Sequence, residues 1–65
     1  MEKMKEKMIS WIRNLDEGIM QHKRKGEAVP DKLVTQYMEA SAIASHLGIL
    51  SYDEIRKIEI EVSRY

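Results

Sequence analysis

The chain has 65 residues, of which 43% are hydrophobic and 34% charged, and its 11 basic and 11 acidic side chains cancel. A chain of this length forms one domain and buries only about 60% of the surface that its unfolded form exposes. It contains no cysteine, and its two histidines are not spaced as metal ligands, so we expect no disulfide, no metal site and no cofactor. Association with another chain is therefore the expected source of additional stability.

The sequence also bears on membranes and on the cell compartment. No apolar run approaches the roughly 18 residues of a membrane span, and the first residues alternate Glu and Lys instead of forming the apolar stretch of a signal peptide. We therefore predict a cytoplasmic protein without a membrane partner. The zero net charge provides no overall attraction to nucleic acid or to anionic membranes.

A long first helix is predicted over residues 2–25. Its apolar residues recur at alternating spacings of three and four, the pattern of a helix seam, and further apolar residues widen that face to about half of the cylinder. One partner helix could not cover so wide a face. The last turn is basic and precedes Gly26, which predicts the end of the helix. The seam comprises Met1, Met4, Met8, Trp11, Leu15, Gly18 and His22.

A second helix is predicted over residues 30–47, with Pro30 as its first residue. The small residues of its middle would let another helix approach closely, and we expect Gly18 of the first helix to lie there. Gly48 is the expected left-handed residue after its end. The face predicted to point inward comprises Leu33, Tyr37, Ala40, Ala44 and Leu47.

A third helix is predicted over residues 52–64, because Ser51 followed by Glu54 is a capping box. The alternation of apolar residues with glutamates over residues 58–62 would also suit a strand. Helix is favoured because a lone strand would have nothing to pair with. In a helix, Ile60 points away from the core.

The stretch LSYDEIRKI at residues 50–58 resembles the turn and helix of the interaction hairpins in Sin-type repressors and antirepressors. The resemblance covers nine residues. It implies that this segment pairs helix to helix with a partner.

These elements predict an all-α fold with a single helical domain over residues 1–65. In this three-helix assembly, the long first helix forms an antiparallel hairpin with the second, and the shorter third helix folds back across them. Because the apolar face of the first helix is so wide, we expect a homodimer that completes the core.

Enzymatic chemistry has little support in the sequence. Asp16 and Glu17 are adjacent, so on a helix they point in different directions, and we expect both to be ordinary solvated charges. His22 and His46 lie 24 residues apart, and the chain contains no phosphate-binding loop or nucleophile motif. We predict that the protein is not an enzyme and has no catalytic residues.

The function favoured by these features is protein–protein interaction. We predict a small module, a regulator or inhibitor, that occupies a surface of a partner protein whose identity the sequence does not specify. Methionine and aromatic side chains suit an adaptable docking surface. The candidate interface residues are Met4, Met8, Trp11, Ile19, Met20 and Ile60.

The alternative is a small dimeric DNA-binding transcriptional regulator with a segment at residues 41–60 that is similar to a helix-turn-helix. The charge distribution disfavours it, because residues 1–27 carry seven basic and five acidic side chains, net +2, whereas residues 28–65 carry four and six, net −2. Nucleic acid is therefore not the expected partner. The candidate anion contacts are Lys23, Arg24 and Lys25.

Overall fold

The computed structural model describes residues 2–64 and contains three helices, with no strand in that range. They are α1 (Glu2–Arg24), α2 (Asp31–His46) and α3 (Tyr52–Ser63). The all-helical prediction is confirmed, and the predicted helix bounds are right to within one residue at each end. Residues 58–62 lie in α3, so the strand alternative is wrong. Pro30 precedes the first residue of α2 instead of forming it.

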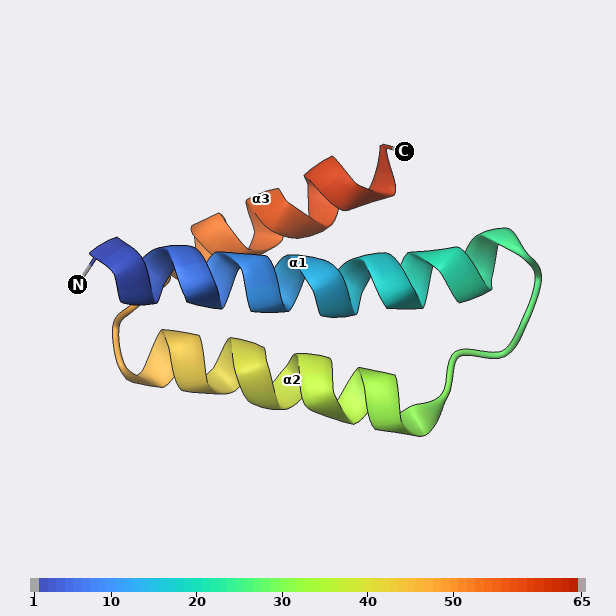
Figure 1. The fold of residues 1–65 in the computed structure, drawn as a ribbon, viewed down its shortest axis with the longest axis horizontal. Coiled ribbons are helices and arrows are strands. Elements are labelled where there is room, and N and C mark those ends of the chain that lie inside the picture. The colour runs from blue at the N-terminus through green and yellow to red at the C-terminus, as the bar shows by residue number, and fades with distance from the viewer. Residues whose placement is uncertain (1, 65) are drawn as a thin grey trace.

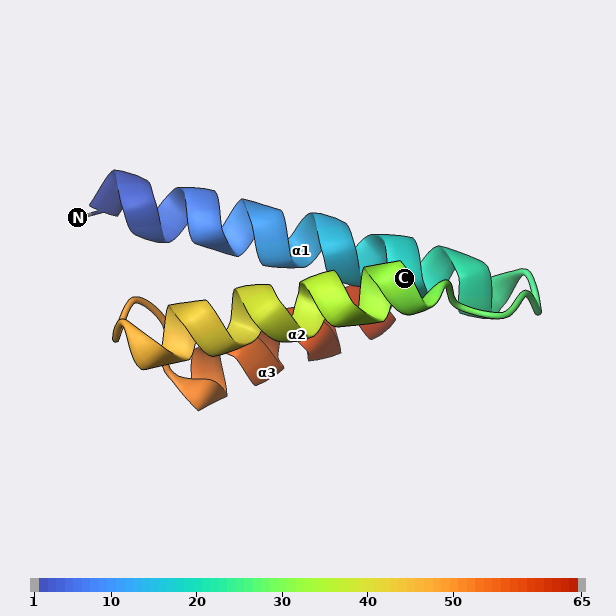
Figure 2. The same ribbon diagram turned by 90° about the horizontal axis from the view of Figure 1, so that it is seen from below.

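The long helix α1 is the shared element of the fold, because it packs against both α2 and α3. After the loop that follows α1, the chain returns beside that helix as α2, so that the last turns of α2 lie beside the first half of α1 (Figures 1 and 2). The helix α3 then lies along another side of α1. The contacts between α2 and α3 are few by comparison. The two shorter helices are thus held together mainly through α1.

The hydrophobic core lies along one stripe of α1 and joins all three helices. Ile12 is its centre and is completely buried. The buried residues of α1 are Ile12, Asp16 and Ile19, so the predicted seam through Met4, Met8, Trp11 and Leu15 is rotated by roughly a quarter turn from the true one. The rotation arises because the core stripe must face two helices at once. The rest of the core cluster comprises Ala40, Ala44, Leu50, Ile55, Ile58 and Val62.

Two packing predictions for α2 need correction. Leu47 was expected to point inward, but its side chain is 64% exposed, because α2 ends at His46 and Leu47 lies in the turn beyond it. Gly18 was expected to face the small residues in the middle of α2. It instead faces Leu33, and a Cβ atom added at Gly18 would lie 3.6 Å from the Leu33 Cδ1 atom, an ordinary contact.

Glycines in the left-handed region end α1 and α2, as predicted. Gly26 and Gly48 have φ angles of 71° and 70°. In each case the amide of the following residue donates to a carbonyl five residues earlier: Glu27 to His22 at 2.9 Å, and Ile49 to Ala44 at 2.9 Å. These bonds satisfy carbonyls that the helix end would otherwise leave unpaired. A side chain at either position would strain the backbone.

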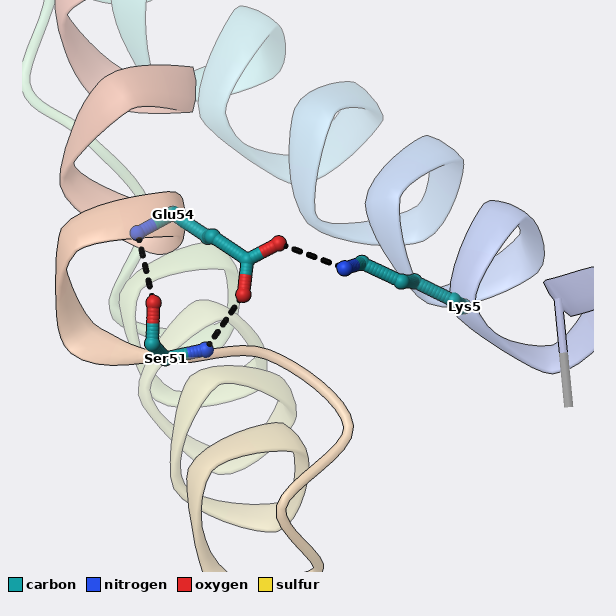
Figure 3. Close-up of polar contacts among 3 residues, drawn as sticks. All are labelled: Lys5, Ser51 and Glu54. Atoms are coloured by element: carbon teal, nitrogen blue, oxygen red, sulfur yellow. Dashed lines mark hydrogen bonds and ion pairs between the residues drawn. The ribbon is translucent and has the colours of Figure 1, made fainter.

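The capping box at the start of α3 is present and is extended by a residue of α1 (Figure 3). The Glu54 amide donates to Ser51 Oγ at 3.2 Å, and the Ser51 amide donates to Glu54 Oε1 at 3.0 Å. The other carboxylate oxygen, Oε2, lies 2.7 Å from Lys5 Nζ. The Lys5 ammonium, together with the Ser51 amide, lowers the pKa of Glu54 to about 2. Glu54 therefore caps α3 and also ties it to α1.

Candidate binding groove

A groove of about 590 Å³ lies between the second half of α1, the first half of α2 and the second half of α3. It exists because α2 and α3 each pack against α1 and make few contacts with each other. A volume of this size is within the range of ligand-binding pockets in proteins. Its lining residues are Asp16, Ile19, Met20, Lys23, Val29, Val34, Tyr37, Arg56, Glu59, Ile60 and Ser63.

Asp16 of α1 is a buried carboxylate in the lining of this groove. Its side chain is only 8% exposed, and its Oδ2 atom has no hydrogen-bond partner among residues 2–64. The prediction that Asp16 is an ordinary solvated charge is therefore wrong. Burial raises the pKa of Asp16, and the nearby Glu59 carboxylate raises it further, while the Lys23 ammonium opposes the shift.

A second carboxylate, that of Glu59 on α3, lies close to Asp16. The Tyr37 hydroxyl of α2 donates a hydrogen bond to Glu59 Oε1, which links the two helices across the groove. Burial and this hydrogen bond raise the pKa of Tyr37 above its usual value, so the hydroxyl remains a donor at neutral pH. Asp16 Oδ2, by contrast, has no donor among residues 2–64.

The rest of the lining combines apolar walls with a basic rim. Val34 and Ile60 are exposed apolar residues on α2 and α3, and Met20 of α1 is partly buried. Lys23 and Arg56 are the exposed cations of the lining. The groove thus has negative charge at its buried floor, apolar side walls and positive charge at its exposed edge.

Sequence reasoning missed Asp16, Arg56 and Glu59 as members of a site. A signal for Asp16 was present, because it lies four residues after Ile12 and three before Ile19 and so shares their stripe on the helix. Nothing comparable marks Arg56 or Glu59, whose positions depend on how α3 lies against α1.

The six candidate interface residues do not form one surface. Ile19, Met20 and Ile60 line the groove, whereas Met4 and Trp11 are exposed on the first half of α1. Met8 is partly buried against the core. Trp11, expected in the buried seam, is 45% exposed because the core stripe of α1 is rotated away from it.

Four other exposed apolar side chains lie on the first half of α1, at the end of α2 and in the turn after it; we group them as the α1–α2 face and define it as Met4, Trp11, Ile43 and Leu47. All four side chains are exposed, and Figures 1 and 2 place the end of α2 beside the first half of α1. Helical spacing places Trp11 and Ile43 on other sides of their helices than the residues that contact α3. On α1, Trp11 lies about 160° around the helix from Arg13, whose guanidinium pairs with Glu61 of α3 at 2.8 Å. On α2, Ile43 lies about 120° around the helix from Tyr37, which bonds Glu59 of α3.

The three candidate anion contacts have different environments. Lys23 lines the groove, and the Arg24 guanidinium donates to the Val62 carbonyl oxygen of α3 at 2.9 Å. Lys25 is exposed beyond the end of α1. One of the three is therefore engaged in holding α1 to α3.

Within the part of the chain that the structure describes, no cluster of three or more His, Asp or Glu side chains is arranged to hold a metal ion. None of the helices in residues 2–64 has the length and apolar character needed to cross a membrane. Comparison with protein families, curated proteins and solved structures finds no match for this chain. The short resemblance at residues 50–58 thus receives no support from these comparisons.

Proposed function

We propose that this chain is a small cytoplasmic protein–protein interaction module that forms a homodimer and acts as a regulator or inhibitor by occupying a surface of a partner protein. The α1–α2 face is the observation that carries the proposal. In it, α1 and α2 act as an antiparallel hairpin that leaves Met4, Trp11, Ile43 and Leu47 exposed. Tryptophan and methionine are enriched in the cores of protein interfaces, and exposed apolar patches mark such sites.

The size of the domain supports association through this face. The largest fully buried side chains are only Ile12 and Leu50, so the core of the isolated chain is small. Small helical domains commonly gain stability by binding another chain. Covering the α1–α2 face would remove four large apolar side chains from water and would bury the indole of Trp11.

The DNA-binding alternative has less support. The first turn of α3 carries Asp53 and Glu54, which phosphates would repel. Arg24 is bonded to the Val62 carbonyl, and Lys23 lies beside the acidic floor of the groove.

Sedimentation equilibrium from 1 to about 200 µM, combined with Trp11 fluorescence, tests the proposal. Trp11 is the only tryptophan, so its emission reports on this face alone. We expect concentration-dependent dimerisation accompanied by a blue shift, and loss of both in Leu47→Lys. Thr35→Lys is the matched control, because it adds the same charge to an exposed position of α2 outside the face. A monomer at all concentrations, with unchanged Trp11 emission, would contradict the dimer.

A further inference from the structure

The floor of the groove has the chemistry of a cation-binding site. Asp16 Oδ2 is buried and unpartnered among the described residues, and the Glu59 carboxylate lies near it. A buried acceptor without a donor is unfavourable, and a charge-assisted hydrogen bond from a cation would satisfy it. Lys23 is close enough to influence Asp16, but no hydrogen bond joins the two side chains. No side chain among residues 2–64 donates to Asp16 Oδ2, so this acceptor is open to a donor from another molecule.

The walls of the groove indicate what accompanies the cation. Val34 of α2 and Ile60 of α3 are exposed apolar side chains in the lining, which also includes Met20 of α1. A freely hydrated metal ion or ammonium ion would leave these walls uncovered. A cation on an alkyl stem, such as the side chain of lysine or arginine, would cover them while its head group reaches Asp16.

The position of the groove favours a helix as the carrier of that side chain. Its lining comes from all three helices, and α2 and α3 both pack on α1 but make few contacts with each other. A fourth helix laid there would pack against both shorter helices and close the assembly as in a four-helix bundle.

We propose that the groove binds an apolar helix of a partner protein that inserts one lysine or arginine side chain between Val34 and Ile60 to pair with Asp16. This inference rests on the proposed interaction function and specifies the chemistry of the partner.

The charged residues at the edge of the groove indicate what else the partner helix carries. Lys23 and Arg56 are exposed at the edge of the groove and would repel a generally basic segment. They instead favour acidic residues beside the apolar ones on the partner helix. The inserted cation is therefore a single buried contact, not part of a polybasic sequence.

A displayed library of helical peptides tests the proposal, with one central arginine fixed and the neighbouring positions randomised. Peptides selected on the wild-type protein are then synthesised with arginine or with its neutral isostere citrulline, and their dissociation constants are measured by isothermal titration calorimetry. We expect the citrulline peptides to bind at least about tenfold more weakly, because they cannot neutralise the buried carboxylate.

Two protein variants test whether Asp16 causes the preference for arginine over citrulline. Asp16→Asn should remove the preference for arginine over citrulline, whereas Glu17→Gln, which makes the same charge change at an exposed neighbour, should keep it. Circular dichroism checks that both variants remain helical. Amide chemical shifts of residues near Tyr37 and Ile60 should move when the arginine peptide binds to the wild type.

Several outcomes would overturn the proposal. They are failure to select any arginine-dependent binder, equal affinity of the arginine and citrulline peptides, and a preference that survives in Asp16→Asn. Binding of butylguanidinium as tight as that of the peptides would assign the groove to a small molecule, and loss of self-association in Asp16→Asn would assign it to a second copy of the chain. The peptide-binding results do not depend on the α1–α2 face, so the dimerisation test with Leu47→Lys judges the proposed function separately.

Discussion

Replacing Asp16 by asparagine should stabilise the free protein. The carboxylate is buried, and its Oδ2 atom has no donor, while the neighbouring Glu59 repels its charge. Asparagine removes the buried charge and its repulsion by Glu59 but remains polar, so the cost of an unsatisfied buried polar group, about 1–3 kcal/mol, is the upper bound of the gain. Because the groove opens to solvent, we expect the lower end, about 1 kcal/mol. For a domain of this size, that corresponds to an increase in Tm of roughly 4–8 °C.

The stability gained by Asp16→Asn should be larger at neutral pH than at acidic pH. Folding raises the pKa of Asp16 above its unfolded value of 3.8, so the folded protein binds this proton more tightly than the unfolded chain does. The carboxylate of Asp16 therefore destabilises the wild type at neutral pH, and this contribution fades as the pH falls through the folded pKa towards 4. Urea unfolding followed by circular dichroism at pH 7 and pH 4 should show a difference between variant and wild type that is larger at pH 7.

Glu17→Gln is the control for the loss of one negative charge, and its effect should be within about 0.5 kcal/mol, as for most surface substitutions. If Asp16→Asn lowers the urea midpoint at pH 7, the carboxylate makes a stabilising interaction in the free protein, for instance with Lys23. In that case the groove has no unpaired acceptor, and the reasoning is wrong.

Four further changes probe the helices and the core by unfolding measurements. Ile12→Ala should cost about 3 kcal/mol and leave little cooperative unfolding, because Ile12 is completely buried at the centre of the core; a small loss would show that the site collapses around the cavity. Gly18→Ala should add about 0.5–1 kcal/mol, since the new methyl group finds ordinary contact with Leu33; a loss would indicate closer packing than 3.6 Å. Ser51→Ala should cost about 1 kcal/mol through the lost cap. The stability contributed by the Glu54 carboxylate should be complete above its unfolded pKa of 4.5 and lost as the pH falls through about 2. Glu54→Gln should therefore be less stable than the wild type at pH 7. Equal stability would show that the contacts of the carboxylate with Ser51 and Lys5 contribute nothing.

The sequence predicts the elements of this fold better than their packing, because helix ends depend on neighbouring residues. Ser51 and Glu54 lie three residues apart, and their capping box forms whatever surrounds it. Gly26 and Gly48 end their helices for an equally local reason, since only glycine adopts their positive φ angles at low cost. These predictions needed no knowledge of the tertiary structure.

The buried stripe of α1 could not be located in the same way. Its apolar residues cover about half of the helix, and periodicity alone cannot tell which part faces two helices and which part remains exposed. The seam through Trp11 has the better spacing, but the stripe through Ile12 and Asp16 lies where α2 and α3 meet α1. A carboxylate in the buried stripe also argues against that stripe in any sequence-based prediction. The sequence-based prediction missed the groove for this reason, since Asp16, which lies at its floor, is excluded from the buried face by the apolar pattern of α1.

Asp16 is thus the point at which the local rules of folding and the observed packing disagree. A leucine or alanine at that position would continue the apolar stripe from Ile12 to Ile19 and would fit the core without an unpaired charge. Sequences that specify a fold well depart from such rules mainly where a residue has another task. In a domain with so small a core, an unfavourable buried carboxylate is a large fraction of the available stability. The disagreement is resolved if a cation from a partner pairs with Asp16, because the group that weakens the free chain then strengthens the complex.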